Sequence, residues 1–171
     1  MPKSLLAFVD ETRAWVKSDV GTSIDWVPRE SSFSELAIEP KITTIDDIGR
    51  HSADNIDIFV GDMFDLSRSV LRRVDAIYDR AALVALPETM RRRYAVHLIE
   101  ITDRAPQLLI SYNYDQSLVD GPPFSVSNEE VNRLYRDSYA LTPLASVEVI
   151  GGLKGKCPAR ENVWLLKRRD V

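Results

Sequence analysis

Asp79 and Arg80 are the adjacent charged residues best placed for chemistry. They follow Val74, Ala76 and Ile77, an apolar burst with the length of a buried strand, and they precede AALVAL, which can enter a helix. In an open α/β sheet, ligands bind in the crevice beyond the carboxyl ends of the strands. The two residues are therefore either a ligand-binding pair or a surface ion pair in a loop, and this segment alone favours the surface pair.

Four motifs in order along the chain change this interpretation. They are GD-x-FDL at 61–66, VDAIYDRAALVALP at 74–87, YDQSL-x-DGPPFSV at 114–126 and E-x-VWLL at 161–166. Together they resemble the thiopurine S-methyltransferase family, whose members use S-adenosylmethionine and have the class I methyltransferase fold. The resemblance extends from about Phe33 to Lys167. It implies a cytoplasmic enzyme that methylates the sulfur of thiopurine-like aromatic thiols.

The resemblance also implies a fold. We expect a single α/β domain over 1–171, with a divergent part at 1–32 and a family-like part at 33–167. Its sheet should be Rossmann-like and mostly parallel, with an antiparallel hairpin at the carboxyl terminus and an incomplete amino-terminal part.

Arg80 matches the family's arginine at the cofactor, which reaches toward the substrate. A guanidinium there could stabilise a thiolate or hold a ring nitrogen as charge shifts. Asp79 would orient Arg80 through a bidentate pair. The resemblance assigns Asp62 and Met63 to the adenine of S-adenosylmethionine; the structural alternatives are an aspartate that caps a turn and a methionine in the core.

The resemblance places substrate contacts in two loops. Pro123 and Phe124 of the DGPPFSV segment would wall a flat aromatic substrate, although a purely structural turn is a competing interpretation. Lys154 or Lys156 would bring a positive charge near the substrate, and which of them faces the pocket is left open. The substrate itself is also open, because an aromatic thiol and a small selenium or tellurium species make similar demands.

The amino-terminal part departs from the family pattern. No glycine-containing loop of the kind that holds the cofactor precedes Gly21, and Ser23 stands where an acidic residue should grip the ribose. Asp25 lies on the same face if the region is a strand, so it could substitute, or it could be a strand-end aspartate. Two hypotheses follow. The chain is an active enzyme, or it is a truncated, inactive family member that acts as a binding or dimerisation module.

Periodicity predicts the elements that position these residues. We expect helices over 4–18 (capped by Ser4), 28–37, Pro87–Ile101 and after the Ser127 cap, a short strand over 22–27, a loop or an irregular strand pair over 38–52, and strands Ile56–Val60, Val74–Tyr78, Leu108–Tyr112, Leu144–Ile150 and Val163–Leu166. In the Pro87–Ile101 helix, Met90, Tyr94 and Leu98 should face inward, with His97 packed and hydrogen-bonded, whereas Arg91, Arg92 and Arg93 should be solvated. His51 should be a solvated loop side chain.

The amino-acid composition limits the classes of molecule that the protein is expected to bind. The formal net charge is -4, from 22 Lys plus Arg against 26 Asp plus Glu, which argues against nucleic acid. The one cysteine, Cys157, suits a reducing cytoplasm. No apolar run approaches the length of a membrane span, and no residues have the spacing of a metal site. We therefore expect a small-molecule substrate, no nucleic-acid, membrane or metal partner, and leave the oligomeric state open.

Overall fold

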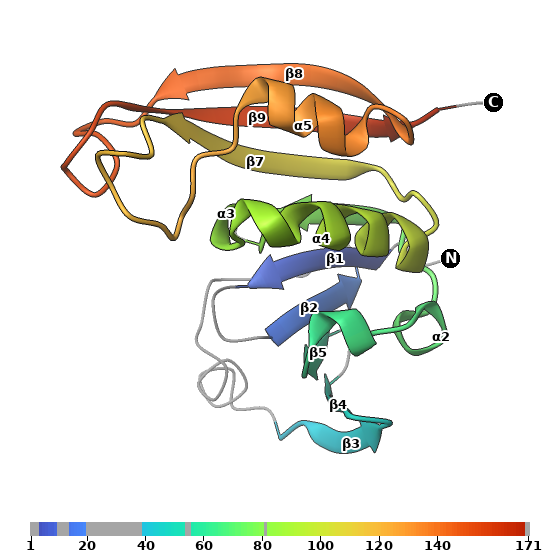
Figure 1. Ribbon diagram of the computed structural model, residues 1–171. Helices are drawn as coiled ribbons and strands as arrows, with labels where there is room; N and C mark the ends of the chain where they lie inside the picture. The colour runs from blue at the N-terminus through green and yellow to red at the C-terminus, as the bar shows by residue number, and fades with distance from the viewer. Residues whose placement is uncertain (1–3, 10–13, 20–38, 54–55, 81, 170–171) are drawn as a thin grey trace.

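A nine-stranded sheet with helices packed on it forms the described part of the chain (Figure 1). The computed structural model describes residues 4–9, 14–19, 39–53, 56–80 and 82–169. The strands are β1 Ser4–Val9, β2 Ala14–Asp19, β3 Lys41–Ile45, β4 Ile48–Ala53, β5 Ile56–Val60, β6 Ala76–Asp79, β7 Gln107–Tyr114, β8 Tyr139–Glu148 and β9 Ala159–Arg168. The helices are η1 Met63–Asp65, α2 Arg68–Leu71, α3 Ala82–Ala85, α4 Glu88–Ile101 and α5 Asn128–Tyr135.

The sheet is mixed, in the order β3-β4-β5-β2-β1-β6-β7-β9-β8. The α/β fold and the antiparallel β8–β9 hairpin are confirmed, but the prediction of a mostly parallel sheet is wrong. Among the described strands, parallel pairing is confined to β1–β6 and β6–β7. The other pairs are antiparallel: four join strands that follow one another in the chain, and β2–β5 and β7–β9 join strands that do not. Helix α4 provides the crossover between the parallel strands β6 and β7.

The helix predicted over 4–18 is wrong, because these residues form the antiparallel strands β1 and β2. The strand β1 has neighbours on both edges, β2 and β6. A near-continuous apolar run such as LLAFV suits a strand inside a sheet, although the same residues also satisfy a helical spacing. The strand predicted over 22–27, which includes Ser23 and Asp25, and the helix predicted over 28–37 lie outside the described residues.

Of the two alternatives predicted for 38–52, the strand pair is confirmed over the described residues 39–52. The strands β3 and β4 form an antiparallel hairpin, and β4 also pairs with β5. His51 lies on β4 opposite Ile42 and Ile58 and is half-buried, so the prediction of a solvated loop histidine is wrong. Its cross-strand neighbours on β3 and β5 flank the side chain, which leaves it half-buried.

Helices α4 and α5 contribute to the core with Tyr94, Leu98, Val131 and Tyr135, all at most 1% exposed. The predicted α4 and the Ser127 cap of α5 are confirmed, and the Ser127 hydroxyl accepts from the Glu130 amide.

The predicted orientation of α4 is wrong for two residues, because Arg91 is 4% exposed and Met90 is 38% exposed. Arg91 lies three and seven residues before Tyr94 and Leu98, which places it on the same stripe of the helix.

Candidate active site

Asp79 is the most deeply buried charged residue near the carboxyl end of β6, at 0% exposed. One carboxylate oxygen accepts from the backbone amides of Ala82 and Leu83, at 3.1 and 3.2 Å. The other accepts from the Tyr94 hydroxyl at 2.9 Å and from the Gln107 amide at 3.5 Å. Burial raises the pKa of Asp79 from its ordinary value of 3.8 to about 6, against the lowering effect of the hydrogen bonds from Tyr94 and the two amides.

The expected bidentate pair between Asp79 and Arg80 is therefore wrong. Both oxygens of Asp79 are used inside the protein, where they fix the start of α3 and the position of Tyr94. Successive residues of an extended chain point to opposite sides, and Arg80 is exposed whereas Asp79 is buried. Asp79 shapes the turn that carries Arg80 but does not contact its side chain.

Arg80 instead lies beside the carboxyl-terminal half of β7. Tyr112 donates to a Glu161 carboxylate oxygen at 3.0 Å across the β7–β9 pair. Burial and then Glu161 raise the pKa of Tyr112, while the charge and hydrogen bonding of Arg80 lower it. The exposed guanidinium of Arg80 thus shares this edge of the sheet with a phenol and a carboxylate that we did not predict as site residues. Glu161 belongs to the E-x-VWLL motif, so this motif was the sequence feature that could have pointed to Glu161 as a site residue.

The GPPF segment, residues 121–124, also lies at this edge. The Phe124 amide donates to the Val84 carbonyl of α3 at 2.6 Å, and the Tyr114 hydroxyl donates to the Pro123 carbonyl at 2.7 Å. The half-buried Phe124 ring lies over Gly121, where an added Cβ would fall within 2.3 Å of it. Both predicted wall residues are therefore held firmly next to the helix that follows Arg80.

The two lysines differ in position. Lys154 donates from its ammonium to the Pro122 carbonyl at 2.6 Å, so it reaches the GPPF segment. Lys156 is exposed, and its backbone amide donates to the Leu153 carbonyl at 2.9 Å. Of the two candidates, Lys154 is the one next to the predicted substrate wall.

Asp62 and Met63 follow β5, which runs in the same direction as β6. The exposed Asp62 caps η1 by accepting from the Phe64 amide, and Met63 is 6% exposed in the core. The structure favours the structural alternative for both, and their cofactor contact stays a prediction. Asp62 and Arg80 share one edge of the sheet, about 14 Å apart by three strand spacings.

A buried ion pair that we did not predict joins the surrounding helices. Arg91 donates to a Glu130 carboxylate oxygen at 2.7 Å and to the Leu86 carbonyl at 2.9 Å. Its guanidinium carbon is 5.8 Å from the centre of the Phe124 ring. His97, as predicted, is packed and hydrogen-bonded, with Nε2 at 3.0 and 3.1 Å from the Met63 and Leu66 carbonyls.

Comparison with known proteins decides the family. The family model for thiopurine S-methyltransferase matches residues 20–169. A thiopurine S-methyltransferase of Xanthobacter autotrophicus is 48% identical over 159 residues, covering 91% of this chain and 75% of that protein. One from Teredinibacter turnerae is 46% identical, covering 88% of this chain and 71% of its own, and one from Gluconobacter oxydans is 49% identical over 77% and 60%.

The chain belongs to the thiopurine S-methyltransferase family. It is therefore a methyltransferase by descent, and the predicted resemblance is confirmed with a match that begins at residue 20 rather than 33. The four motifs of the family contain Arg80, Asp62, the GPPF segment and Glu161, and the described fold places all of them at or near one edge of the sheet.

The family match also begins after β1 and β2, which occupy the middle of the sheet. The residues between these strands are Asp10, Glu11, Thr12 and Arg13, and none of them is glycine. The strand β1, which pairs with β6, and its neighbour β2 thus lie outside the residues that the family model matches.

No group of acidic, histidine and cysteine residues with the arrangement of a metal site occurs in the described part of the chain. Within the same residues, no helix is long and apolar enough to cross a membrane.

Proposed function

We propose that the chain is an S-adenosylmethionine-dependent S-methyltransferase for thiopurine-like aromatic thiols, with Arg80 as the residue that binds the thiolate. The observation that carries the proposal is the exposed Arg80 guanidinium at the carboxyl edge of β6. Among the described residues Arg80 forms no ion pair, so its charge is available to a ligand.

The protein has to orient the thiol sulfur toward the methyl group and does not need to form a covalent bond to the substrate itself. An aromatic thiol ionises readily, and a guanidinium beside it favours the thiolate further. Pro123 and Phe124 would hold the flat ring while Arg80 holds the anionic sulfur, which fixes the direction of attack. The S-adenosylmethionine sulfonium supplies the methyl group when it is bound.

The described residues fit this cofactor in part. The exposed carboxylate of Asp62 and the exposed guanidinium of Arg80 lie on one edge, with the end of β1 between them. The Asp62 carboxylate can serve the adenine, and the Arg80 guanidinium can hold the thiolate that receives the methyl group. The described residues offer no glycine loop for the methionine end, and segment 10–13 contains no glycine.

Cofactor binding is the test of this proposal. Each missing hydrogen bond to a charged group costs about 1.5–3 kcal/mol, and about 1.4 kcal/mol is a tenfold change in affinity. Two or three missing bonds therefore weaken binding by a few orders of magnitude. Calorimetry on the 171-residue chain should show weak or undetectable S-adenosylmethionine binding, and methylation of a thiopurine should be slow even at millimolar cofactor.

The same experiment separates the second hypothesis, an inactive family member that binds another molecule or a second copy. The glycine-free segment between β1 and β2 favours this hypothesis. A complete absence of methyl transfer at millimolar cofactor would support it. A micromolar dissociation constant would rule it out, because the amino-terminal residues would then rebuild the missing half of the site.

The compartment and the substrate's heteroatom belong to the same proposal. Cys157 is free and buried, which fits a reducing cytoplasm. A selenium or tellurium substrate would meet the same guanidinium, so the methylation assay should include a selenol beside the thiol.

A further inference from the structure

A cavity lies at the opposite edge of the sheet from Arg80. Its volume is about 570 Å³. Asp75, directly before β6, and Pro106, directly before β7, are among the residues that line it. Arg80 lies five residues beyond Asp75, which is about 17 Å along an extended chain. The cavity is therefore separate from the candidate active site.

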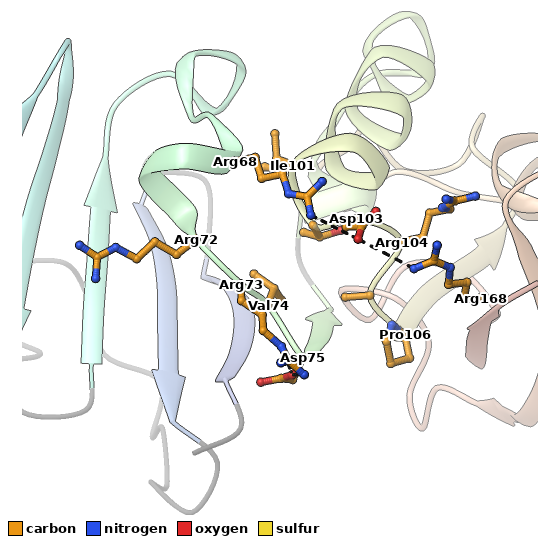
Figure 2. Close-up of a pocket in the computed structure, with 12 residues that line it drawn as sticks. Arg68, Arg72, Arg73, Val74, Asp75, Ile101, Asp103, Arg104, Pro106 and Arg168 are labelled. Atoms are coloured by element: carbon orange, nitrogen blue, oxygen red, sulfur yellow. Dashed lines mark hydrogen bonds and ion pairs between the residues drawn. The ribbon is translucent and has the colours of Figure 1, made fainter. Parts of the chain in front are cut away.

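Positive charge dominates the rim of this cavity. Five arginines line it against two aspartates, in a protein whose formal net charge is -4. Arg73 is already paired with Asp75 at 2.8 Å. Figure 2 shows Arg68 from α2 and Arg168 from β9 reaching Asp103 from two sides, whereas the Arg72 side chain points away. Arg68 and Arg168, which lie 3.3 and 3.9 Å from the same Asp103 oxygen, repel each other, and a bound anion relieves this repulsion.

Asp103 neutralises Arg68 and Arg168 only in part, through long contacts. One carboxylate oxygen serves both, at 3.3 Å from an Arg68 nitrogen and 3.9 Å from an Arg168 nitrogen. All three side chains are about half exposed or more, at 64%, 49% and 47% for Arg68, Arg168 and Asp103. A phosphate group offers three oxygens and matches the fork of a guanidinium with two parallel hydrogen bonds.

Part of the lining beside the arginines is apolar. Val74, Ile101 and Ala105 are 7%, 5% and 6% exposed, and Pro106 lies beside them. An apolar patch beside a cationic rim suits a ligand with an anionic head and a carbon body. The volume falls in the range of sites for small organic ligands.

We propose that this cavity binds a small phosphorylated organic molecule. The phosphate lies between Arg68 and Arg168 in place of the Asp103 carboxylate, and the organic body packs on Val74 and Pro106. The proposal does not depend on the methyltransferase function, because none of these residues belongs to the candidate active site.

The test uses the full chain and phenyl phosphate, with inorganic phosphate as a second probe, in calorimetric titrations. Phenyl phosphate should bind more tightly than inorganic phosphate, and its affinity should fall as salt is added. Arg68→Gln and Arg168→Gln should each weaken binding about tenfold or more. The matched control is Arg133→Gln, because Arg133 is also 64% exposed and ion-paired but lies outside the cavity.

Asp103→Asn should strengthen binding, because it removes the carboxylate that competes with the phosphate, and a general loss of structure cannot produce this gain. Asn tolerates the left-handed backbone at this position, where φ is 54°. Arg80→Gln should leave binding unchanged. The proposal is overturned if phenyl phosphate shows no saturable binding, if Arg133→Gln weakens it as much as Arg68→Gln, or if Arg80→Gln alone abolishes it. Equal affinities for the two probes would also overturn the proposal, because the organic body would then gain nothing from the apolar residues.

Discussion

Asp79 and Arg80 are neighbours in the chain but have separate roles. Asp79 is enclosed by two amides and the Tyr94 hydroxyl, while Arg80 faces outward beside Tyr112. The sequence motif predicted that both residues matter. It did not predict this division, because side-chain direction at the end of a strand depends on the turn that follows.

The ionisation of Asp79 should make the protein less stable as pH rises from about 4 to about 6. Its folded-state pKa, about 6, exceeds its ordinary value of 3.8, so the folded state binds more protons than the unfolded state in this window. The free energy of unfolding then falls with rising pH, by about 3 kcal/mol from this group. Below pH 4 the penalty is absent.

Urea unfolding of the wild type and of Asp79→Asn across this range measures the effect, since the difference between the two cancels the other titrating groups. The wild type should lose stability relative to Asp79→Asn as pH rises. A difference that stays constant from pH 4 to pH 7 would show that Asp79 does not titrate in this way.

The Arg91–Glu130 pair should be costly to break from one side. Arg91→Met leaves a nearly buried Glu130 carboxylate unpaired and should lower the free energy of unfolding by about 3–5 kcal/mol. The double variant Arg91→Met with Glu130→Met should recover much of that loss. In the exposed pair of Arg133 and Glu88, Arg133→Met should cost less than about 1 kcal/mol. Equal losses in the single and double variants would contradict the role of the pair.

At the scale of elements, helices and hairpins far along the chain were the most predictable. The strands at 56–60 and 107–114 and the helix at 88–101 have clear periodicity and clear ends. The run LLAFV did not distinguish a helix from a strand, because the choice depends on pairing with β6, some 70 residues later. The burial of Arg91 was likewise hidden, since its partner Glu130 lies on another helix.

The GPPF loop should depend on the absence of a side chain at Gly121. A methyl group there would fall within 2.3–2.6 Å of Phe124 ring atoms, so Gly121→Ala must displace the ring. We expect a higher apparent KM for an aromatic thiol with a smaller change in apparent kcat, measured by steady-state kinetics at one fixed millimolar cofactor concentration. The control is Gly49→Ala, where the new methyl group meets its nearest neighbour at 3.5 Å. An unchanged KM in Gly121→Ala would show that the ring does not wall the substrate.

At the scale of the whole molecule, one sheet carries two unlike edges. The carboxyl ends of β5, β6 and β7 present Asp62, Arg80 and the GPPF segment, and the amino ends of β6 and β7 present the arginine cavity. Strand direction made the first edge predictable from the sequence. The arginine cavity at the second edge could not be predicted in this way. Its arginines come from α2, the α4–β7 connection and β9, and no local sequence pattern shows that these segments lie close together.

Thiolate binding by Arg80 is tested most directly without the cofactor. A coloured aromatic thiol such as 4-nitrothiophenol is titrated with pH in the presence of excess protein, and its thiolate absorbance is followed. Arg80 should lower the pKa of the bound thiol by about one unit, because a nearby cation favours the anion by roughly 1.4 kcal/mol. The Arg133→Gln control should behave like the wild type, and Arg80→Gln should bind the thiol weakly and leave its pKa at the free value. If Arg80→Gln binds and ionises the thiol as the wild type does, Arg80 is not the thiolate-binding residue.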